Sequence, residues 1–103
     1  MYIVHIEHSV SDYNAWKKLF DEDPLGRQKM GVRNYRVLRP VDDPRAVIVD
    51  LVFDQKQQAE TMKTALKDFW KRLDSSILIN PKARVLEIAE MKEVTKETIP
   101  MMD

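Results

Sequence analysis

The 103-residue chain contains no cysteine, only two glycines and only two histidines, and its 17 basic and 17 acidic residues cancel. Without cysteine there can be no disulfide framework, no thiolate metal site and no cysteine nucleophile. The lack of net positive charge argues against a nucleic-acid partner, because binding to a phosphate backbone depends on a basic surface. What remains is one small domain with a mixed-charge surface.

Long hydrophobic runs are also missing. The longest aliphatic stretch is residues 46–49 (AVIV), far short of the roughly 18 apolar residues that a membrane span needs. A secretory signal has a basic segment followed by an apolar one, and the N-terminus does not show this pattern. We therefore expect a cytoplasmic protein that does not enter a membrane. Leu, Ile, Val and Phe still make up 28 of 103 residues, enough for a folded core.

The first 31 residues predict a strand followed by a helix. Residues 2–10 (YIVHIEHSV) alternate, as a strand does. Ser11 is expected to cap a helix that Asp23-Pro24 ends or kinks. The apolar positions of this helix recur at helical spacing: Tyr13, Trp16, Leu19 and Phe20. Residues 25–30 are expected to add a turn or two of helix before Gly31, which suits a left-handed position.

The rest of the chain predicts a hairpin, a second helix and a last strand. Residues 32–39 and 45–53 read as strands joined by the turn residues PVDDP. Asp54 is expected to cap the second helix, with Gln57 completing a capping box. Its apolar stripe consists of Ala59, Met62, Leu66, Phe69, Trp70 and Leu73. Residues 83–91 alternate again and predict the fourth strand.

The order βαββαβ predicts a ferredoxin-like α+β fold: a four-stranded antiparallel sheet in the order 4-1-3-2 with both helices on one face. Residues 1–91 form a single domain, and residues 92–103 are expected to be a tail that is flexible or packed on a partner. The positions expected to face the helices are almost all apolar: Val4, Ile6, Tyr35, Val37, Val47, Val49, Leu51, Phe53, Leu86 and Ile88.

The opposite face of the predicted sheet is half apolar, with Ile3, Ile48 and Val52 among its residues. Exposed apolar surface of this kind marks association. We expect a second copy of the chain to cover it, so that two stacked sheets form a barrel-like homodimer. The polar residues predicted for the same face are His5, Glu7, Asn34, Arg36, Asp50 and Glu87.

The segments VHIEHSVSDYNAW, GVRNYRVLRPVDDPRAVIVDLVFD and QKQQAETMKTALKDFW resemble the dimeric α/β-barrel superfamily, which includes antibiotic-biosynthesis monooxygenase-like and haem-degrading proteins. The resemblance covers residues 2–91. It implies a homodimer whose relatives include cofactor-free oxygenases acting on polycyclic phenols. The haem-degrading pattern has Asn on strand one, Trp on helix two and a later His ligand. Here Glu7 is expected at the strand-one position, Trp70 is present and no His follows His8, so no haem or other cofactor is expected.

Three interpretations of the polar face remain open. In the catalytic one, Glu7 or His5 removes a proton from a phenol or enol, Arg36 stabilises the oxyanion, and Asn34, Asp50 and Glu87 bind substrate. In the structural one, Arg36 and Asp50 form an ion pair, while His5 and Glu7 are satisfied across the two-fold axis. In the third, His5 and Glu7 reach one metal ion, although no metal is expected.

Aromatic residues of the helices offer a second candidate region. Trp16, Phe69 and Trp70 could form a cleft between the helices and the sheet, where a planar substrate would stack, or they could simply be core. His8, near the end of the first strand on the helix side, is expected to be a partly exposed hydrogen-bonding residue. Together these patterns predict a homodimer that binds a small hydrophobic or aromatic molecule and resembles cofactor-independent monooxygenases. The alternative is a non-catalytic ligand-binding or interaction dimer.

Overall fold

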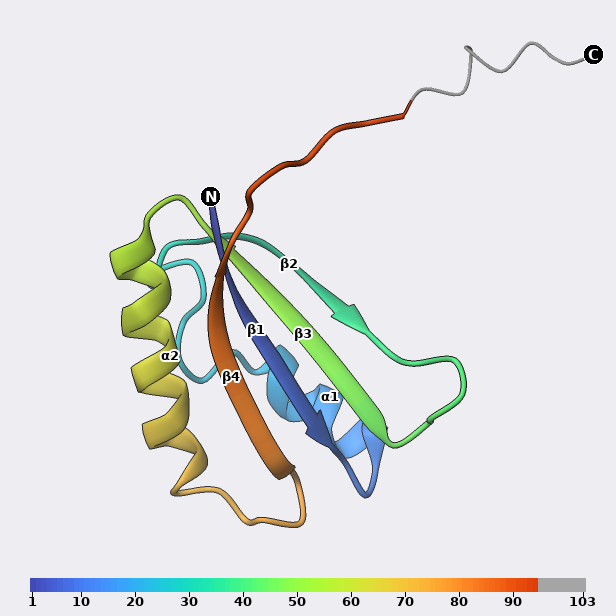
Figure 1. The fold of residues 1–103 in the computed structure, drawn as a ribbon. Helices are drawn as coiled ribbons and strands as arrows, with labels where there is room; N and C mark the ends of the chain where they lie inside the picture. Colours follow the sequence, from blue (N-terminus) through green and yellow to red (C-terminus); the bar gives the residue numbers. More distant parts are fainter. Residues whose placement is uncertain (95–103) are drawn as a thin grey trace, which may run out of the picture.

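The computed structural model describes residues 1–94. Its elements, in chain order, are β1 (Tyr2–Ser9), α1 (Tyr13–Asp21), β2 (Val32–Leu38), β3 (Ala46–Phe53), α2 (Lys56–Trp70) and β4 (Ile79–Glu87) (Figure 1). All strand pairs are antiparallel, and the order across the sheet is β2-β3-β1-β4. The predicted ferredoxin-like fold and strand order are therefore confirmed. The predicted tail lies mostly outside the described residues.

Both helices pack on the same face of the sheet, because alternate strand residues and the apolar helix stripes form one core. Figure 1 shows α1 behind the strands and α2 along the edge beside β4. Trp16 of α1 and Met62 of α2 meet the same group of buried strand residues: Val4, Ile6, Val47, Val49, Leu51 and Phe53. No packed element covers the opposite face of the sheet in the described chain, and we call it the open face.

The register of β4 corrects one sequence prediction. The strand begins at Ile79, four residues earlier than expected. Val85 pairs with Val4 and so shares the helix side, whereas Leu86 pairs with Ile3 on the open face. Within residues 85–89 (VLEIA), apolar residues occupy both odd-numbered and even-numbered positions. Alternation alone therefore could not show which of them face the helices, and the pairing with β1 determined it.

Glu87 therefore does not join the polar residues of the open face. It pairs with Tyr2, and this places it on the side of the sheet that faces the helices. The open-face positions of β4 are instead occupied by Lys82, opposite Glu7, and Arg84, opposite His5. The prediction that Glu87 lies beside His5 and Glu7 was wrong.

Each predicted helix cap was displaced by one residue. Asp12, not Ser11, caps α1, with its Oδ1 accepting from the backbone N–H groups of Asn14 and Ala15 at 2.9 and 3.3 Å. The Ser11 hydroxyl instead donates to the carbonyl of Ser76. At α2, Gln55 and Gln58 form the capping box.

The connection between α1 and β2 forms turns rather than the extra helix predicted for residues 25–30. Gly31 ends this connection with a φ of +96°, as predicted for a left-handed glycine. No helix within residues 1–94 has both the length and the apolar character needed to cross a membrane.

Candidate functional site

The structure does not bring the two predicted sets of site residues together. His5 and Arg36 lie in register with Asp50 on the open face. Trp16 and Trp70 line a cavity on the helix side. Because a single sheet separates the two faces, one small ligand cannot contact both sets. The protein therefore has two distinct candidate regions.

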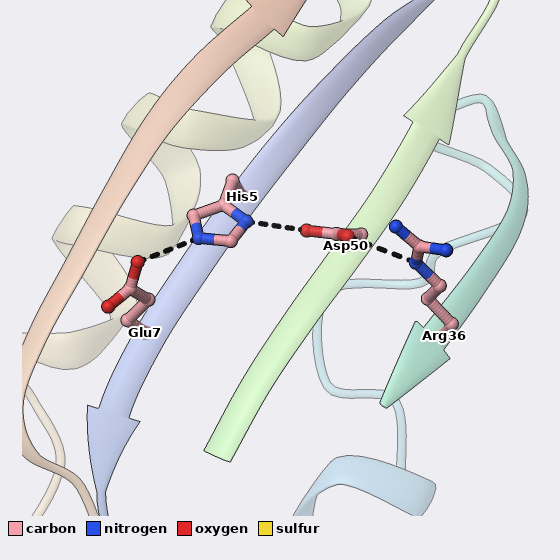
Figure 2. A network of polar contacts seen from close by, with 4 residues as sticks. All are labelled: His5, Glu7, Arg36 and Asp50. Atoms are coloured by element: carbon pink, nitrogen blue, oxygen red, sulfur yellow. Dashed lines mark hydrogen bonds and ion pairs between the residues drawn. The ribbon is translucent and has the colours of Figure 1, made fainter. Parts of the chain in front are cut away.

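The open face carries a continuous chain of polar contacts across three strands (Figure 2). The two ring nitrogens of His5 each contact a carboxylate: Nδ1 lies 2.7 Å from Oδ1 of Asp50, and Nε2 lies 2.8 Å from Oε2 of Glu7. The other oxygen of Asp50 accepts from Nε of Arg36 at 3.1 Å. We call these four residues the open-face network.

The open-face network favours a positively charged His5. A neutral imidazole has only one N–H group, whereas two ionised carboxylates both require a donor. Burial alone lowers the pKa of His5, but its hydrogen bonds and charge interactions with Glu7 and Asp50 outweigh burial and raise that pKa above 6.5. An imidazolium has no free lone pair, so His5 in this arrangement is not placed to act as a proton acceptor. The Arg36–Asp50 ion pair of the structural interpretation is present, but His5 and Glu7 contact each other within one protomer and not, as predicted, a partner across a two-fold axis.

The other residue predicted to bind substrate on the open face is exposed. Asn34 lies on the exposed surface of β2, in register with Val52. Leu38 and Leu86 are 39% and 37% exposed, so the face retains apolar surface between its charges. Within residues 1–94, no group of three or more His, Cys, Asp or Glu side chains is arranged to hold a metal ion.

The cavity on the helix side is open to solvent at its mouth and has an accessible volume of about 80 Å³. That volume is below the roughly 300 Å³ at which sites for drug-sized molecules begin. The predicted aromatic cleft of Trp16, Phe69 and Trp70 is part of its lining, together with aliphatic residues of both helices and the sheet. The polar or charged residues in the lining are His8, Asp23 and Arg27.

His8 is a candidate site residue that the sequence analysis placed on the helix side without assigning it to the site. It is only 6% exposed, and its ring lies 5.2 Å from that of Trp16, so the prediction of a partly exposed residue was wrong. Its Nδ1 lies 3.3 Å from the carbonyl oxygen of Ser9 and must be the donor, because a carbonyl only accepts. Burial lowers the pKa of His8 below 6.5, which keeps the ring neutral with its lone pair on Nε2.

The Nε2 atom of His8 is not fully buried. No side-chain nitrogen or oxygen in the described chain is both fully buried and without a hydrogen-bond partner. Since Nδ1 makes the only hydrogen bond of this ring, Nε2 must retain accessible surface, and the ring lines the cavity. The signal was present in the sequence: position 8 has the parity of Val4 and Ile6, which were predicted to face the helices. The residues of β1 that line the cavity are Ile6 and His8, whereas Glu7 lies on the open face.

Comparisons with known proteins support the fold. No family model and no curated protein matches the sequence. A candidate antibiotic biosynthesis monooxygenase from Deinococcus radiodurans is 18% identical with a TM-score of 0.60, covering 93% of this chain and 100% of that one. SnoaB, a cofactor-independent oxygenase from Streptomyces nogalater, solved as a mutant, is 10% identical with a TM-score of 0.65, covering 87% and 94%.

A third solved structure, a dimeric ferredoxin-like protein from an uncultured marine organism, is 10% identical with a TM-score of 0.58, covering 90% of this chain and 97% of that one. At such identities the likeness concerns the fold, and function has to be argued from the site. The chain thus has the ferredoxin-like fold of the antibiotic biosynthesis monooxygenase-type proteins.

Proposed function

We propose that the protein binds a small aromatic or enolic molecule in the helix-side cavity and activates it by removing a hydroxyl proton with His8, as a monooxygenase-like enzyme without a resident cofactor. The observation that carries this proposal is a neutral imidazole that lines a mostly aromatic and aliphatic cavity and has no hydrogen-bond partner at Nε2 within residues 1–94. Such a group is a suitable general base near neutral pH. The fold shared with SnoaB supports the reaction class.

The chemistry needs only the substrate and dioxygen. Transfer of the hydroxyl proton to Nε2 gives an imidazolium and an electron-rich phenolate or enolate. A conjugated carbon of this anion that carries one hydrogen then bonds to O₂, and the resulting peroxide takes back the proton from the imidazolium. Loss of the hydrogen on that carbon with cleavage of the O–O bond gives a ketone and one molecule of water, so that each product receives one oxygen atom. Trp16 and Trp70 are proposed to hold the ring system by stacking and to exclude bulk water.

We propose that the open face is covered by a second copy of the chain. Its apolar residues support this proposal, as does Asp50, whose side chain is 6% exposed although no element packs on that face. The open-face network would then fix how the two sheets pair, since each charge already has a partner within its own protomer. Asn34, Glu7 and Arg36 are exposed polar residues of this face and are available for contacts between the copies.

A non-catalytic ligand-binding or interaction dimer is the second candidate. One observation favours it: the charges of the open-face network contact one another and do not line the helix-side cavity. In this case His8 would only orient a bound ligand.

Oxygen uptake with an enolisable tricyclic ketone such as anthrone tests the catalytic proposal. We expect His8→Gln to lower the rate at least a hundredfold, as loss of a general base does, with ligand affinity retained. A similar loss in His5→Gln, with His8→Gln active, would return the role of base to the open face. Absence of turnover in the native protein, with binding intact, would favour the second candidate.

Light scattering tests the dimer. The native protein should have twice the mass of one 12.1 kDa chain. Ile48→Glu introduces a charge on the open face, opposite Glu7, and should give monomers. The matched control Val41→Glu, in the exposed β2–β3 turn, should remain dimeric. A native protein that runs as a monomer at micromolar concentration would contradict the proposal.

A further inference from the structure

An aromatic wall joins the two polar ends of the helix-side cavity. The ring of His8 lies 5.2 Å from Trp16, and Trp16 is stacked on Phe20 at 5.1 Å. The guanidinium carbon of Arg27 lies 4.1 Å from the centre of the Phe20 ring. All four side chains line the cavity. Because these rings pack against one another, a planar ligand would lie along their edges, with a base near one end and a fixed cation near the other.

Arg27 is held in place by its surroundings. Its guanidinium lies between the rings of Phe20 and Tyr35, at 4.1 and 4.7 Å. Nη1 donates to the carbonyl of Phe20 at 2.9 Å, and Oδ1 of Asp23 lies 3.6 Å from the same nitrogen. The side chain is 18% exposed. A cation fixed in this way needs little ordering to receive an anion.

The guanidinium also retains donors for a ligand. An arginine side chain has five N–H donors. Within residues 1–94, the guanidinium of Arg27 donates a hydrogen bond only through Nη1. The carboxylate of Asp23 is engaged by the backbone N–H of Arg27 at 2.9 Å and is 37% exposed, so it only partly offsets the positive charge. Arginine pairs with carboxylates in a two-point geometry, which makes a carboxylate the anion that best fits this position.

We infer that the ligand is an elongated planar aromatic acid, with a carboxylate that binds Arg27 and a hydroxyl group that faces His8. The inference rests on the proposed function and narrows it to a substrate class. Neutral aromatic hydrocarbons lack both recognition groups, and simple phenols lack the one that Arg27 binds. Arg27 is thus a specificity-determining residue rather than a catalytic one.

Isothermal titration calorimetry with matched naphthalenes tests this inference. The probes are 6-hydroxy-2-naphthoate, its methyl ester and 2-naphthol. We expect the acid to bind the native protein at least tenfold more tightly than the ester, since a charge-assisted pair is lost in the ester. In Arg27→Gln that advantage should disappear, while 2-naphthol should bind as it does to the native protein.

Arg39→Gln provides the matched control. Arg39 also stacks on an aromatic ring, at 4.0 Å from the centre of Tyr13, but it does not line the cavity. Removing it changes net charge by the same amount and should leave the preference for the acid unchanged. An equal loss in Arg39→Gln would mean that general electrostatics, not a pair with Arg27, attracts the acid, and would overturn the inference.

The remaining outcomes separate this inference from the proposed function. If none of the probes binds, the cavity site itself is wrong. If the native protein binds 2-naphthol and binds acid and ester equally, the cavity site stands and the inference fails. If Arg27→Gln weakens acid and 2-naphthol alike, Arg27 is a structural clamp and the inference also fails. Should that variant not fold, the acid and ester comparison on the native protein still decides.

Discussion

His5 and Asp50 are 45 positions apart in the sequence, yet they face each other directly across β1 and β3 and are joined by a contact of 2.7 Å. The row continues on both sides, with Arg36 next to Asp50 on β2 and Arg84 next to His5 on β4. The sheet thus places a buried carboxylate between a histidine and an arginine. Removal of that carboxylate leaves two cations without their shared partner.

Asp50→Asn is expected to lower the free energy of unfolding by about 2 kcal/mol. This loss is smaller than that usually seen when a buried ion pair is broken, because Arg36 is 67% exposed and water can hydrate it. Urea unfolding at pH 6 measures this. The control is Asp21→Asn, which removes an exposed partner of Lys17 and should change stability by less than about 0.5 kcal/mol. Equal effects of the two variants would show that the open-face network contributes nothing to stability.

The two histidines should titrate on opposite sides of the usual value. The neighbouring carboxylates raise the pKa of His5 above 6.5, whereas burial lowers the pKa of His8 below it. Proton NMR of the ring C–H groups across pH 4 to 9 should resolve two midpoints, and His8→Gln should remove the lower one. Two midpoints that coincide near 6.5 would contradict the environments described for both rings.

Stability should depend on pH through His5 in a defined direction. Because its pKa is raised in the folded state, the folded protein holds this proton more tightly than the unfolded chain. The stabilisation is therefore complete below pH 6.5 and is lost as pH rises through the folded pKa. The native protein should exceed His5→Gln in unfolding free energy at pH 5.5, and this difference should shrink by pH 9. His8 is present in both proteins, so its opposite contribution cancels. A difference that grows with pH would refute the assignment.

Gly31→Ala should destabilise the protein more than Gly26→Ala. Both glycines have positive φ, so any side chain at either position adds strain of about 1 kcal/mol. A Cβ at Gly31 would also lie 2.6 Å from Nε2 of Gln58, which belongs to the capping box of α2, whereas a Cβ at Gly26 would approach Lys29 no closer than 3.5 Å. We expect an additional loss of about 1 kcal/mol in Gly31→Ala, measured by thermal unfolding. Equal losses would mean that the cap adjusts freely.

The fold could be predicted because its strands alternate and its helices have clear apolar stripes. Prediction failed where a local pattern allowed two solutions. In β4 the apolar residues occupy both odd-numbered and even-numbered positions, so Glu87 was assigned to the wrong face of the sheet. At the helix starts, adjacent polar residues compete for the cap, and the choice depends on other contacts. Asp54, for example, forms an ion pair with Arg33 instead of capping α2.

The candidate site was harder to predict because it depends on contacts between distant elements. His8 has the parity of a core residue, but its burial follows from Trp16 of α1 closing over it. The cationic end of the cavity comes from Arg27, in a connection that was expected to be helical. The polar row of the open face was recognised from alternation alone, since strand pairing is fixed once the register is known.

The alternation of β1 also has an evolutionary consequence. Positions 5 and 7 project to one side of the strand, and positions 6 and 8 project to the other. With the dimer and the ligand site as proposed, mutations in the first pair would alter assembly and leave ligand preference intact, and mutations in the second pair would do the reverse. A lineage that carries this strand is free to diversify the two properties independently within four consecutive codons.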